Sequence, residues 1–364
     1  MGIAALPLVF LGTKFWLWHT YGVFDFYTFH LAGVLANQGR IEALYHPDIF
    51  MGFFAPTYGS AGLLPWFYPP ILIPYCQFLA LFPVNIAYLV NGVLSITAYY
   101  AAVSWAFPRH ARDIIILSVL PMIVLLGFGH PSILLLSLII AGSHLARQSL
   151  GKGLLALTIS AAKPHLGGIV LLFLFLRSPR QALLPSVIIF IGFIGGGALL
   201  YGGGIWLAFL HGIGAAATYV GSGTINQQWI ASVYGTFLAY GASNAAAIFA
   251  HVGALLGVTG LALYAFRGSS SRRFWAASGM AMVFASPYLM YYDLVFFLFP
   301  MALVIDSIDI HAARLWVYGL FIGELAMLAI LGFETAAGLG AAVFLGFAAM
   351  LLFGKIRFGR VRGA

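Results

Sequence analysis

The sequence predicts an all-α, polytopic membrane protein with about 10–13 transmembrane or half-spanning helices. Of its 364 residues, 62% are hydrophobic and only 7% are charged, and the mean hydropathy is +1.01. A soluble domain carries roughly 25% charged residues, so a water-soluble fold of this length could not bury the apolar surface. Basic residues fall in short breaks between apolar runs, as in membrane loops. We therefore expect one integral-membrane domain over residues 1–364, in contact with membrane lipids.

The amino-terminal part predicts one span and a long outward loop. Residues 1–18 are apolar around Lys14 and lack both a basic leader and a small-residue cleavage site, so we expect a span and not a removed signal peptide. Residues 19–67 then form a first extracytoplasmic loop with short interfacial helices, one of them over residues 27–37. The lipid-facing side of that helix is expected to hold Phe26, Phe29 and Gly33.

Residues 68–107 contain two apolar runs broken near Pro83. The orientation of the chain requires an odd number of crossings there, so one run lies at the interface or re-enters, and the pattern leaves open which. Many of the later runs have only about 13–17 residues, fewer than the ~20 needed to cross the hydrocarbon core. Short, interrupted helices are tolerated where they line a wet cavity. Residues 201–228 form a second long outward segment, rich in glycine.

From residue 108 onward, breaks between apolar runs that contain Lys or Arg alternate with breaks that contain none except Lys163. We call the second kind bare breaks. Every Lys and Arg except Lys14, Arg40 and Lys163 falls in one set of breaks or in the carboxyl-terminal tail. By the positive-inside rule that set is cytoplasmic, as is the carboxyl terminus, and the bare breaks face outward. The localisation expected is a bacterial plasma (inner) membrane. Because the net charge of +8 is dispersed among these loops, no nucleic-acid partner is expected.

Asp25 is the first candidate for chemistry. It lies between Phe24 and Phe26 straight after the first span, and a partly desolvated carboxylate has a raised proton affinity. Such a group can act as a general base towards a substrate hydroxyl. The alternative is that Asp25 caps the short helix that follows it, and the two roles can coexist.

Three polar breaks, at residues 127–131, 162–165 and 286–293, place ionisable groups at membrane depth. Lys163 lies between apolar stretches, where a cation usually marks a substrate path and would suit a phosphate. His130 and His165 could donate to the same phosphate oxygens. The alternative is an ion pair between Lys163 and Asp293 that holds helices together. The histidines show no metal-ligand spacing, so neither a metal nor a cofactor is expected.

Weak motifs recur in a fixed order along nearly the whole chain. They are Phe24-Asp25-Phe26, Gly39 with Tyr45, Tyr68-Pro69-Pro70, Gly129-His130, Gly153 before Lys163-Pro164, Gly204 with Trp206 and Phe209, and Ser286-Pro287-Tyr288 through Tyr292-Asp293-Leu294. With this ordered set the chain resembles the family-87 glycosyltransferases, integral-membrane enzymes with the C-type glycosyltransferase fold. It departs from the family pattern at His130, where the turn usually holds Gly-Gln. Tyr292 and Asp293 stand in a region where some members carry histidines, so no donor-contacting histidine is carried over to that region.

The resemblance implies a hexosyltransferase that inverts the anomeric carbon. Its donor would be a polyprenyl-phosphate sugar, typically of mannose, and its acceptor a lipid or glycan on the extracytoplasmic face. Asp25 matches the acid of the family's first loop and would be the catalytic base, and Lys163 would bind the lipid phosphate. The expected substrate-contacting residues are Tyr68, Trp206, Tyr292 and Asp293. A transporter or lipid flippase is the alternative from another class, and a non-catalytic membrane subunit is a third.

Overall fold

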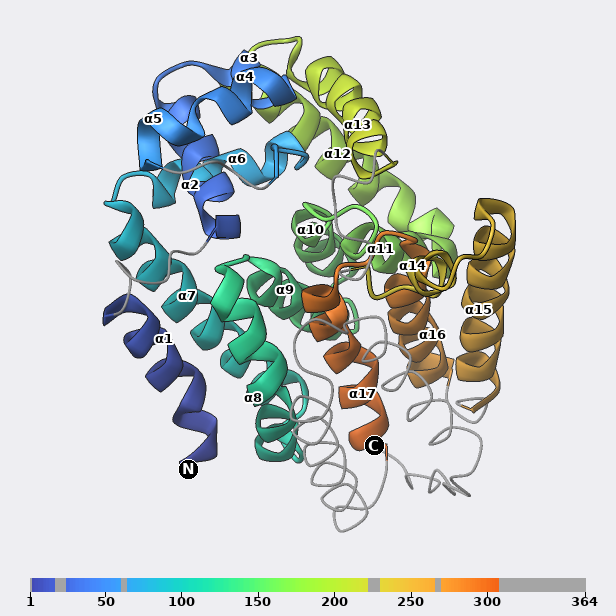
Figure 1. Ribbon diagram of the computed structural model, residues 1–364. Helices are drawn as coiled ribbons and strands as arrows, with labels where there is room; N and C mark the ends of the chain where they lie inside the picture. The colour runs from blue at the N-terminus through green and yellow to red at the C-terminus, as the bar shows by residue number, and fades with distance from the viewer. Residues whose placement is uncertain (1, 17–23, 60–63, 222–229, 266–269, 308–364) are drawn as a thin grey trace.

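The computed structural model describes residues 2–16, 24–59, 64–221, 230–265 and 270–307 (Figure 1). Over these ranges the chain is helical, and the one β feature is an isolated antiparallel bridge between Ile230 and Met290. Four described helices are long and apolar enough to cross a membrane: α7 (Val84–Ala106), α8 (Ala111–Phe128), α12 (Pro179–Tyr201) and α15 (Asn244–Ala265). The prediction of an all-α, polytopic membrane protein is confirmed.

The first predicted span is a helix. A short 3-10 turn, η1 (Ile3–Ala5), leads into α1 (Leu6–Trp16), which packs against α7 and α8. Leu11 is buried over Gly92 of α7, where an added Cβ would lie 2.5 Å from the Leu11 side chain. The missing side chain at Gly92 therefore lets the two helices approach closely.

The helix predicted over residues 27–37 is α2 (Phe24–Asn37), and its surroundings differ from those expected. Phe26 and Phe29 are buried in protein and do not face lipid. At Gly33 an added Cβ would lie 2.0 Å from the Cys76 carbonyl oxygen of α6 (Ile73–Leu79). The expected lipid-facing side is therefore the side that packs on α6. Sequence alone could not reveal this, because a lipid-facing stripe and a protein-facing stripe are equally apolar.

The two apolar runs in residues 68–107 differ in helix length. The first run forms the 3-10 turn η2 (Pro70–Leu72) and α6, which has only seven residues. The second run is α7, whose 23 residues extend for about 35 Å at 1.5 Å per residue. The short run lies beside α2, and of the two runs only α7 is long and apolar enough to cross a membrane.

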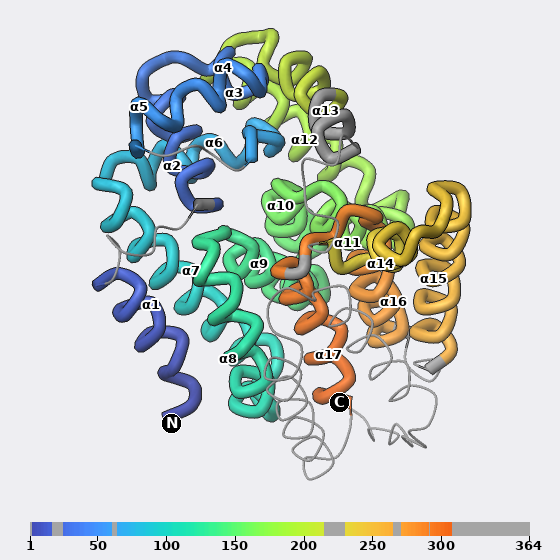
Figure 2. The backbone as a smooth tube through the Cα atoms, viewed as in Figure 1, coloured from blue at the N-terminus to red at the C-terminus, as the bar shows by residue number. Residues whose placement is uncertain are grey.

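Short helices make up the middle of the molecule. They are α9 (Ser132–Leu145), α10 (Leu150–Ser160), α11 (Gly167–Arg177) and α17 (Leu298–Ile305), the last preceded by the 3-10 segment η4 (Tyr291–Phe297). In Figure 2 α9 and η4, the orange segment that precedes α17, lie near the centre of the fold, and η4 contacts both α8 and α9. Because these helices are short, their ends bring polar turns into the interior.

The second predicted outward segment is mostly helical. Gly202, with φ of 93°, ends α12, and α13 then runs over Ile205–Gly221. Only the glycines at 202–204 break the helix, since the apolar residues that follow them are good helix formers. Figure 1 places α13 at the same end of the molecule as α3 (Ile41–Leu44), α4 (Pro47–Gly52) and α5 (Phe54–Tyr58), and α13 contacts α3.

The basic breaks gather away from that end. Arg272 at the start of α16 (Ser270–Ala285) pairs with Asp306 just after α17, at 3.1 Å. Arg109 and Arg147 also lie close enough to act on the Asp306 charge. The described basic breaks around Asp306 therefore share one region, as the alternating pattern predicts. Completing the order of elements, α14 (Val233–Ala239) packs against α15.

Candidate active site

A cavity of about 450 Å³ lies where the polar turns meet. Its walls come from α2, residues 64–68, the turns before α9 and α11, α13, and residues 288–293. The residues lining it are Asp25, Thr28, Phe29, Leu64, Pro65, Phe67, Tyr68, His130, Ala162, Lys163, Pro164, His165, Phe209, Ile213, Ile230, Tyr288, Met290, Tyr292 and Asp293. A mainly apolar chamber therefore holds a small set of charged and hydrogen-bonding groups, as ligand sites do.

Asp25 reaches this cavity from the first turn of α2. It lies inside the helix, so the alternative that it is the capping residue is wrong. Only 8% of the residue is exposed. Burial raises the pKa of the Asp25 carboxyl to about 7, although Lys163 opposes the shift and Asp293 adds to it. A carboxylate with this pKa can accept a proton near neutral pH.

Lys163 is paired with Asp293. The ammonium Nζ lies 2.5 Å from Asp293 Oδ1, both side chains are buried, and Nζ also lies 5.3 Å from the centre of the Tyr292 ring. The ion pair that the sequence offered as an alternative is thus present, and it lies within the cavity wall. An ammonium has three N–H donors, so a pair with one carboxylate oxygen does not use its full capacity.

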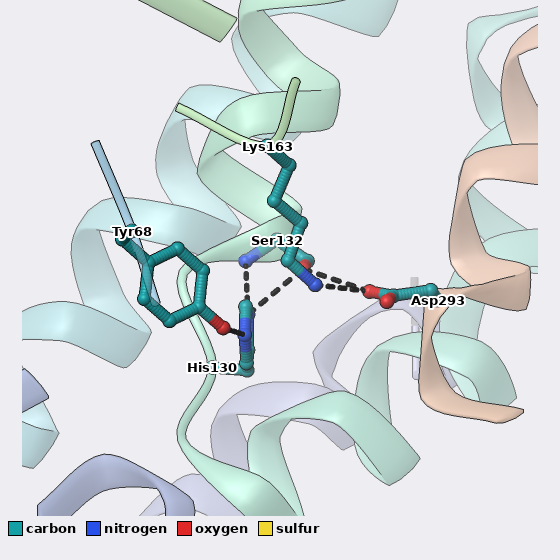
Figure 3. Close-up of polar contacts among 5 residues, drawn as sticks. All are labelled: Tyr68, His130, Ser132, Lys163 and Asp293. Atoms are coloured by element: carbon teal, nitrogen blue, oxygen red, sulfur yellow. Dashed lines mark hydrogen bonds and ion pairs between the residues drawn. The ribbon is translucent and has the colours of Figure 1, made fainter. Parts of the chain in front are cut away.

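His130 takes part in a network with four other residues (Figure 3). Its Nε2 lies 2.7 Å from the Tyr68 hydroxyl, and its Nδ1 accepts from the Ser132 backbone N–H at 3.2 Å. The Ser132 hydroxyl lies 2.8 Å from Nδ1 and 3.2 Å from Asp293 Oδ1. The network therefore joins Tyr68 on one side of the cavity to the Lys163–Asp293 pair on the other. Because both ring nitrogens have protein partners, His130 is not placed to bind a phosphate directly.

The turn that carries His130 is fixed by α6 and α7. Gly129 ends α8 in the left-handed conformation, with φ of 67°. Its carbonyl accepts from the Asn91 side-chain amide at 3.1 Å, and Asn91 Oδ1 in turn accepts from the Tyr75 hydroxyl at 2.7 Å. A residue with a Cβ is disfavoured at Gly129, and the Asn91 contact fixes the direction of the turn.

His165 shares the turn of Lys163 and opens into the cavity. The residue is exposed to the cavity, yet it lies deep in the protein beside the Lys163 ammonium. Burial and the Lys163 charge lower the pKa of His165 to about 4. At neutral pH it is therefore an uncharged ring that can give one hydrogen bond and accept another.

Trp206 does not reach the polar cavity. Its indole N–H donates to the Ile194 carbonyl at 3.0 Å, and its ring packs on Gly197 of α12. It lines a neighbouring cavity of about 590 Å³ between α10, α11, α12 and α13, whose walls are almost wholly apolar. Residues 226–229, which hold further amide and aromatic side chains of the same outward segment, lie outside the described residues.

Sequence reasoning missed several residues that hold the site. Tyr45 donates from its hydroxyl to the Tyr68 carbonyl at 3.0 Å, and Thr28 donates to the Leu64 carbonyl at 3.1 Å. Ser132 and Asn91 have the roles described above. Ser132 could have been found, because it is a polar residue two positions from the candidate His130 at the start of an apolar run. Asn91 lies in a long apolar helix and carried no signal beyond its polarity.

Comparison with protein families decides the relationship that the motifs suggested. Residues 66–290, more than half of the chain, match the sequence model of glycosyltransferase family 87. The chain belongs to glycosyltransferase family 87. It is therefore a membrane glycosyltransferase. No curated protein and no solved structure matches the chain.

The family-87 match covers part of the cavity only. Tyr68, His130 and Lys163 lie within it, whereas Asp25 precedes it and Asp293 follows it. The fold brings all five to one cavity. Within the described ranges, no three His, Cys, Asp or Glu side chains form a group that could hold a metal ion. The expectation of no metal and no cofactor remains a prediction.

Proposed function

We propose that this family-87 enzyme moves a hexose, with mannose as the first candidate, from a polyprenyl phosphate to a lipid or glycan acceptor. The observation that carries the proposal is the cavity itself, where Asp25 and the Lys163–Asp293 pair line one largely apolar chamber. A base and a cation in one chamber suit an acceptor hydroxyl and a departing phosphate, the two groups that this transfer must handle.

A lipid-linked donor is favoured by the neighbouring cavity. Pro164 and Phe209 line both cavities, so the apolar one adjoins the polar one beside Lys163. An isoprenoid chain matches apolar walls of this kind, and its phosphate would then lie near Lys163. A nucleotide sugar would instead place a polar base and ribose against those walls, at the cost of their hydration.

The proposed reaction is a single displacement. The acceptor hydroxyl gives its proton to the Asp25 carboxylate while its oxygen bonds to the anomeric carbon. The bond from that carbon to the phosphate oxygen breaks, and the polyprenyl phosphate leaves with the electron pair. Lys163 and His165 stabilise the charge that gathers on the phosphate. Because attack and departure are on opposite sides, the anomeric configuration inverts.

Orientation follows from the two ends of the molecule. The basic residues around Asp306 belong on the cytoplasmic side by the positive-inside rule. The helices α2 to α5 lie at the other end in Figure 1, and α2 carries Asp25. We therefore propose an extracytoplasmic active site and a cytoplasmic carboxyl terminus in a bacterial inner membrane.

The proposal is tested with the purified protein in lipid. Radiolabelled polyprenyl-phospho-mannose, polyprenyl-phospho-glucose and nucleotide-linked mannose are each offered with a lipid extract of the host. We expect label to reach an extractable product from a polyprenyl donor only, with inverted configuration. Transfer from the nucleotide sugar would contradict the donor class. If no donor gives transfer while a polyprenyl lipid crosses liposome membranes, the transporter alternative replaces the enzyme proposal.

A further inference from the structure

The hydrogen bond between His130 and Tyr68 has a direction that the surrounding groups decide. A neutral imidazole carries one proton, on either Nδ1 or Nε2. Nδ1 lies 3.2 Å from the Ser132 backbone nitrogen and Nε2 lies 2.7 Å from the Tyr68 hydroxyl oxygen. Figure 3 shows the ring between these two partners.

The backbone of Ser132 settles the position of the ring proton. A backbone N–H can only donate, so Nδ1 must be the acceptor. The proton is then on Nε2, which donates to the Tyr68 oxygen. The opposite tautomer would point two N–H groups at each other across 3.2 Å. The Ser132 hydroxyl has one proton, which it can give either to Nδ1 at 2.8 Å or to Asp293 Oδ1 at 3.2 Å, so the backbone N–H and not the hydroxyl decides the tautomer.

The ring stays neutral because of its place in the fold. Burial lowers the pKa of His130 well below its ordinary value, and the charge of Lys163 lowers it further. The Ser132 N–H has no acceptor within α9 because Ser132 is the first residue of that helix. The positive end of the helix dipole also disfavours an imidazolium at His130. Nδ1 therefore remains an acceptor at neutral pH.

This tautomer leaves the Tyr68 hydroxyl proton unused by His130. The hydroxyl oxygen accepts from Nε2, and its own proton is free to turn towards the cavity that Tyr68 lines. Burial and the neighbouring charges of Asp293 and Asp25 raise the pKa of Tyr68. The phenol is therefore a hydrogen-bond donor throughout the neutral range and not a base.

We propose that the Tyr68 hydroxyl donates a hydrogen bond to an oxygen of the donor phosphate, and that His130 is the positioning residue that makes it a donor. The ligand identity in this proposal rests on the proposed function. A phosphate oxygen is favoured over the acceptor hydroxyl for two reasons. The phosphate oxygens only accept, and the His130–Ser132–Asp293 network leads from Tyr68 to Lys163, on the phosphate side.

The first test determines the tautomer of His130 directly and does not require a transfer assay. The full-length protein is labelled with ¹⁵N-histidine and studied in lipid by NMR, and the His130 signals are assigned by their loss in His130→Gln. We expect a neutral ring with the proton on Nε2 between about pH 6 and 8. A ring protonated on Nδ1, or an imidazolium, would overturn the inference.

The second test measures transfer in three variants. Tyr68→Phe removes the donor and should lower kcat by roughly 10²-fold, the usual loss for one preorganised donor. Glutamine retains one N–H donor and one acceptor, so His130→Gln should keep most of the wild-type kcat. Leucine retains neither, so His130→Leu should resemble Tyr68→Phe. Equal activity in the glutamine and leucine variants would show that the ring is packing only.

A second tyrosine–histidine pair gives the control. The Tyr58 hydroxyl lies 2.8 Å from His30 Nδ1, and neither residue lines the cavity. Tyr58→Phe should therefore leave kcat unchanged. If wild-type protein transfers no sugar, the proposed function fails, but the tautomer result stands. Full kcat in Tyr68→Phe alongside an active wild type would overturn this inference and spare the proposed function.

Discussion

The ammonium of Lys163 and the carboxylate of Asp293 lie 2.5 Å apart although 130 residues separate them in the chain. The pair joins the turn between α10 and α11 to η4, which contacts α9. Two charges buried together are costly to separate, because either one alone would remain unpaired in a low-dielectric interior. The pair therefore fixes the geometry of the cavity as well as supplying its cation.

Breaking the Lys163–Asp293 pair from one side should destabilise the protein. Lys163→Met leaves an unpaired carboxylate, and Asp293→Leu leaves an unpaired ammonium, each at a cost of about 3–5 kcal/mol. The double variant leaves no charge and should unfold at a temperature above that of either single variant. The measurement is the unfolding midpoint in detergent. Additive losses in the double variant would show that the pair contributes no coupling.

Transfer should depend on pH through Asp25. Its pKa is raised to about 7, and a protonated carboxyl cannot accept the proton of the acceptor. The value of kcat/KM should therefore fall about tenfold for each pH unit below 7 and level off above it. The phosphodiester donor does not titrate in this range. A profile that is flat from pH 5 to pH 8 would contradict the assignment of Asp25 as the base.

The packing of α2 on α6 should control the position of Asp25. Gly33→Ala places a Cβ 2.0 Å from the Cys76 carbonyl oxygen, so α2 must shift. We expect a stability loss of about 1–3 kcal/mol and a reduced kcat. Gly253→Ala in α15 is the control, since nothing lies within 4 Å of its added Cβ. The control should be neutral or slightly stabilising. An equal response of the two variants would contradict the close approach.

The apolar cavity should select the lipid tail of the donor. Gly168 lines it with nothing within 4 Å of an added Cβ, so Gly168→Trp fills its space. We expect a raised KM for a long-chain polyprenyl donor and little change for an analogue with a short prenyl chain. Gly151→Trp is the control, because that glycine is in neither of the two cavities. Equal effects on both chain lengths would place the tail elsewhere.

Much of the site could be predicted from the sequence because membranes make charge expensive. Lys163 and Asp293 stand out where nearly every neighbour is apolar, and the positive-inside rule separates the bare breaks from the basic ones. The described basic breaks do gather around Asp306, and the bare breaks with His130, Lys163 and Asp293 do meet at one cavity. The sequence does not distinguish phosphate binding by Lys163 from an ion pair with Asp293, and the structure shows the pair.

Other features could not be read from one sequence. The period of α2 does not tell whether Phe26 and Phe29 face lipid or protein. Trp206 has the composition of a sugar-binding residue, yet its indole N–H is bound to the Ile194 carbonyl. Tyr68, which pairs with His130 Nε2, lies 62 residues away in the chain, and the direction of that bond depends on the Ser132 amide beside Nδ1. Such contacts arise from tertiary packing, which no local pattern encodes.

The assignment of Asp25 as the catalytic base is tested most directly by comparing Asp25→Asn with wild type in lipid, using radiolabelled polyprenyl-phospho-mannose. Both the transfer rate and the binding of the donor are measured. Asp48→Asn, a change at an exposed acid of the same loop, is the control and should transfer normally. We expect Asp25→Asn to bind the donor as wild type does and to transfer no sugar, because asparagine cannot accept the proton. Equal transfer by Asp25→Asn and wild type would contradict the assignment.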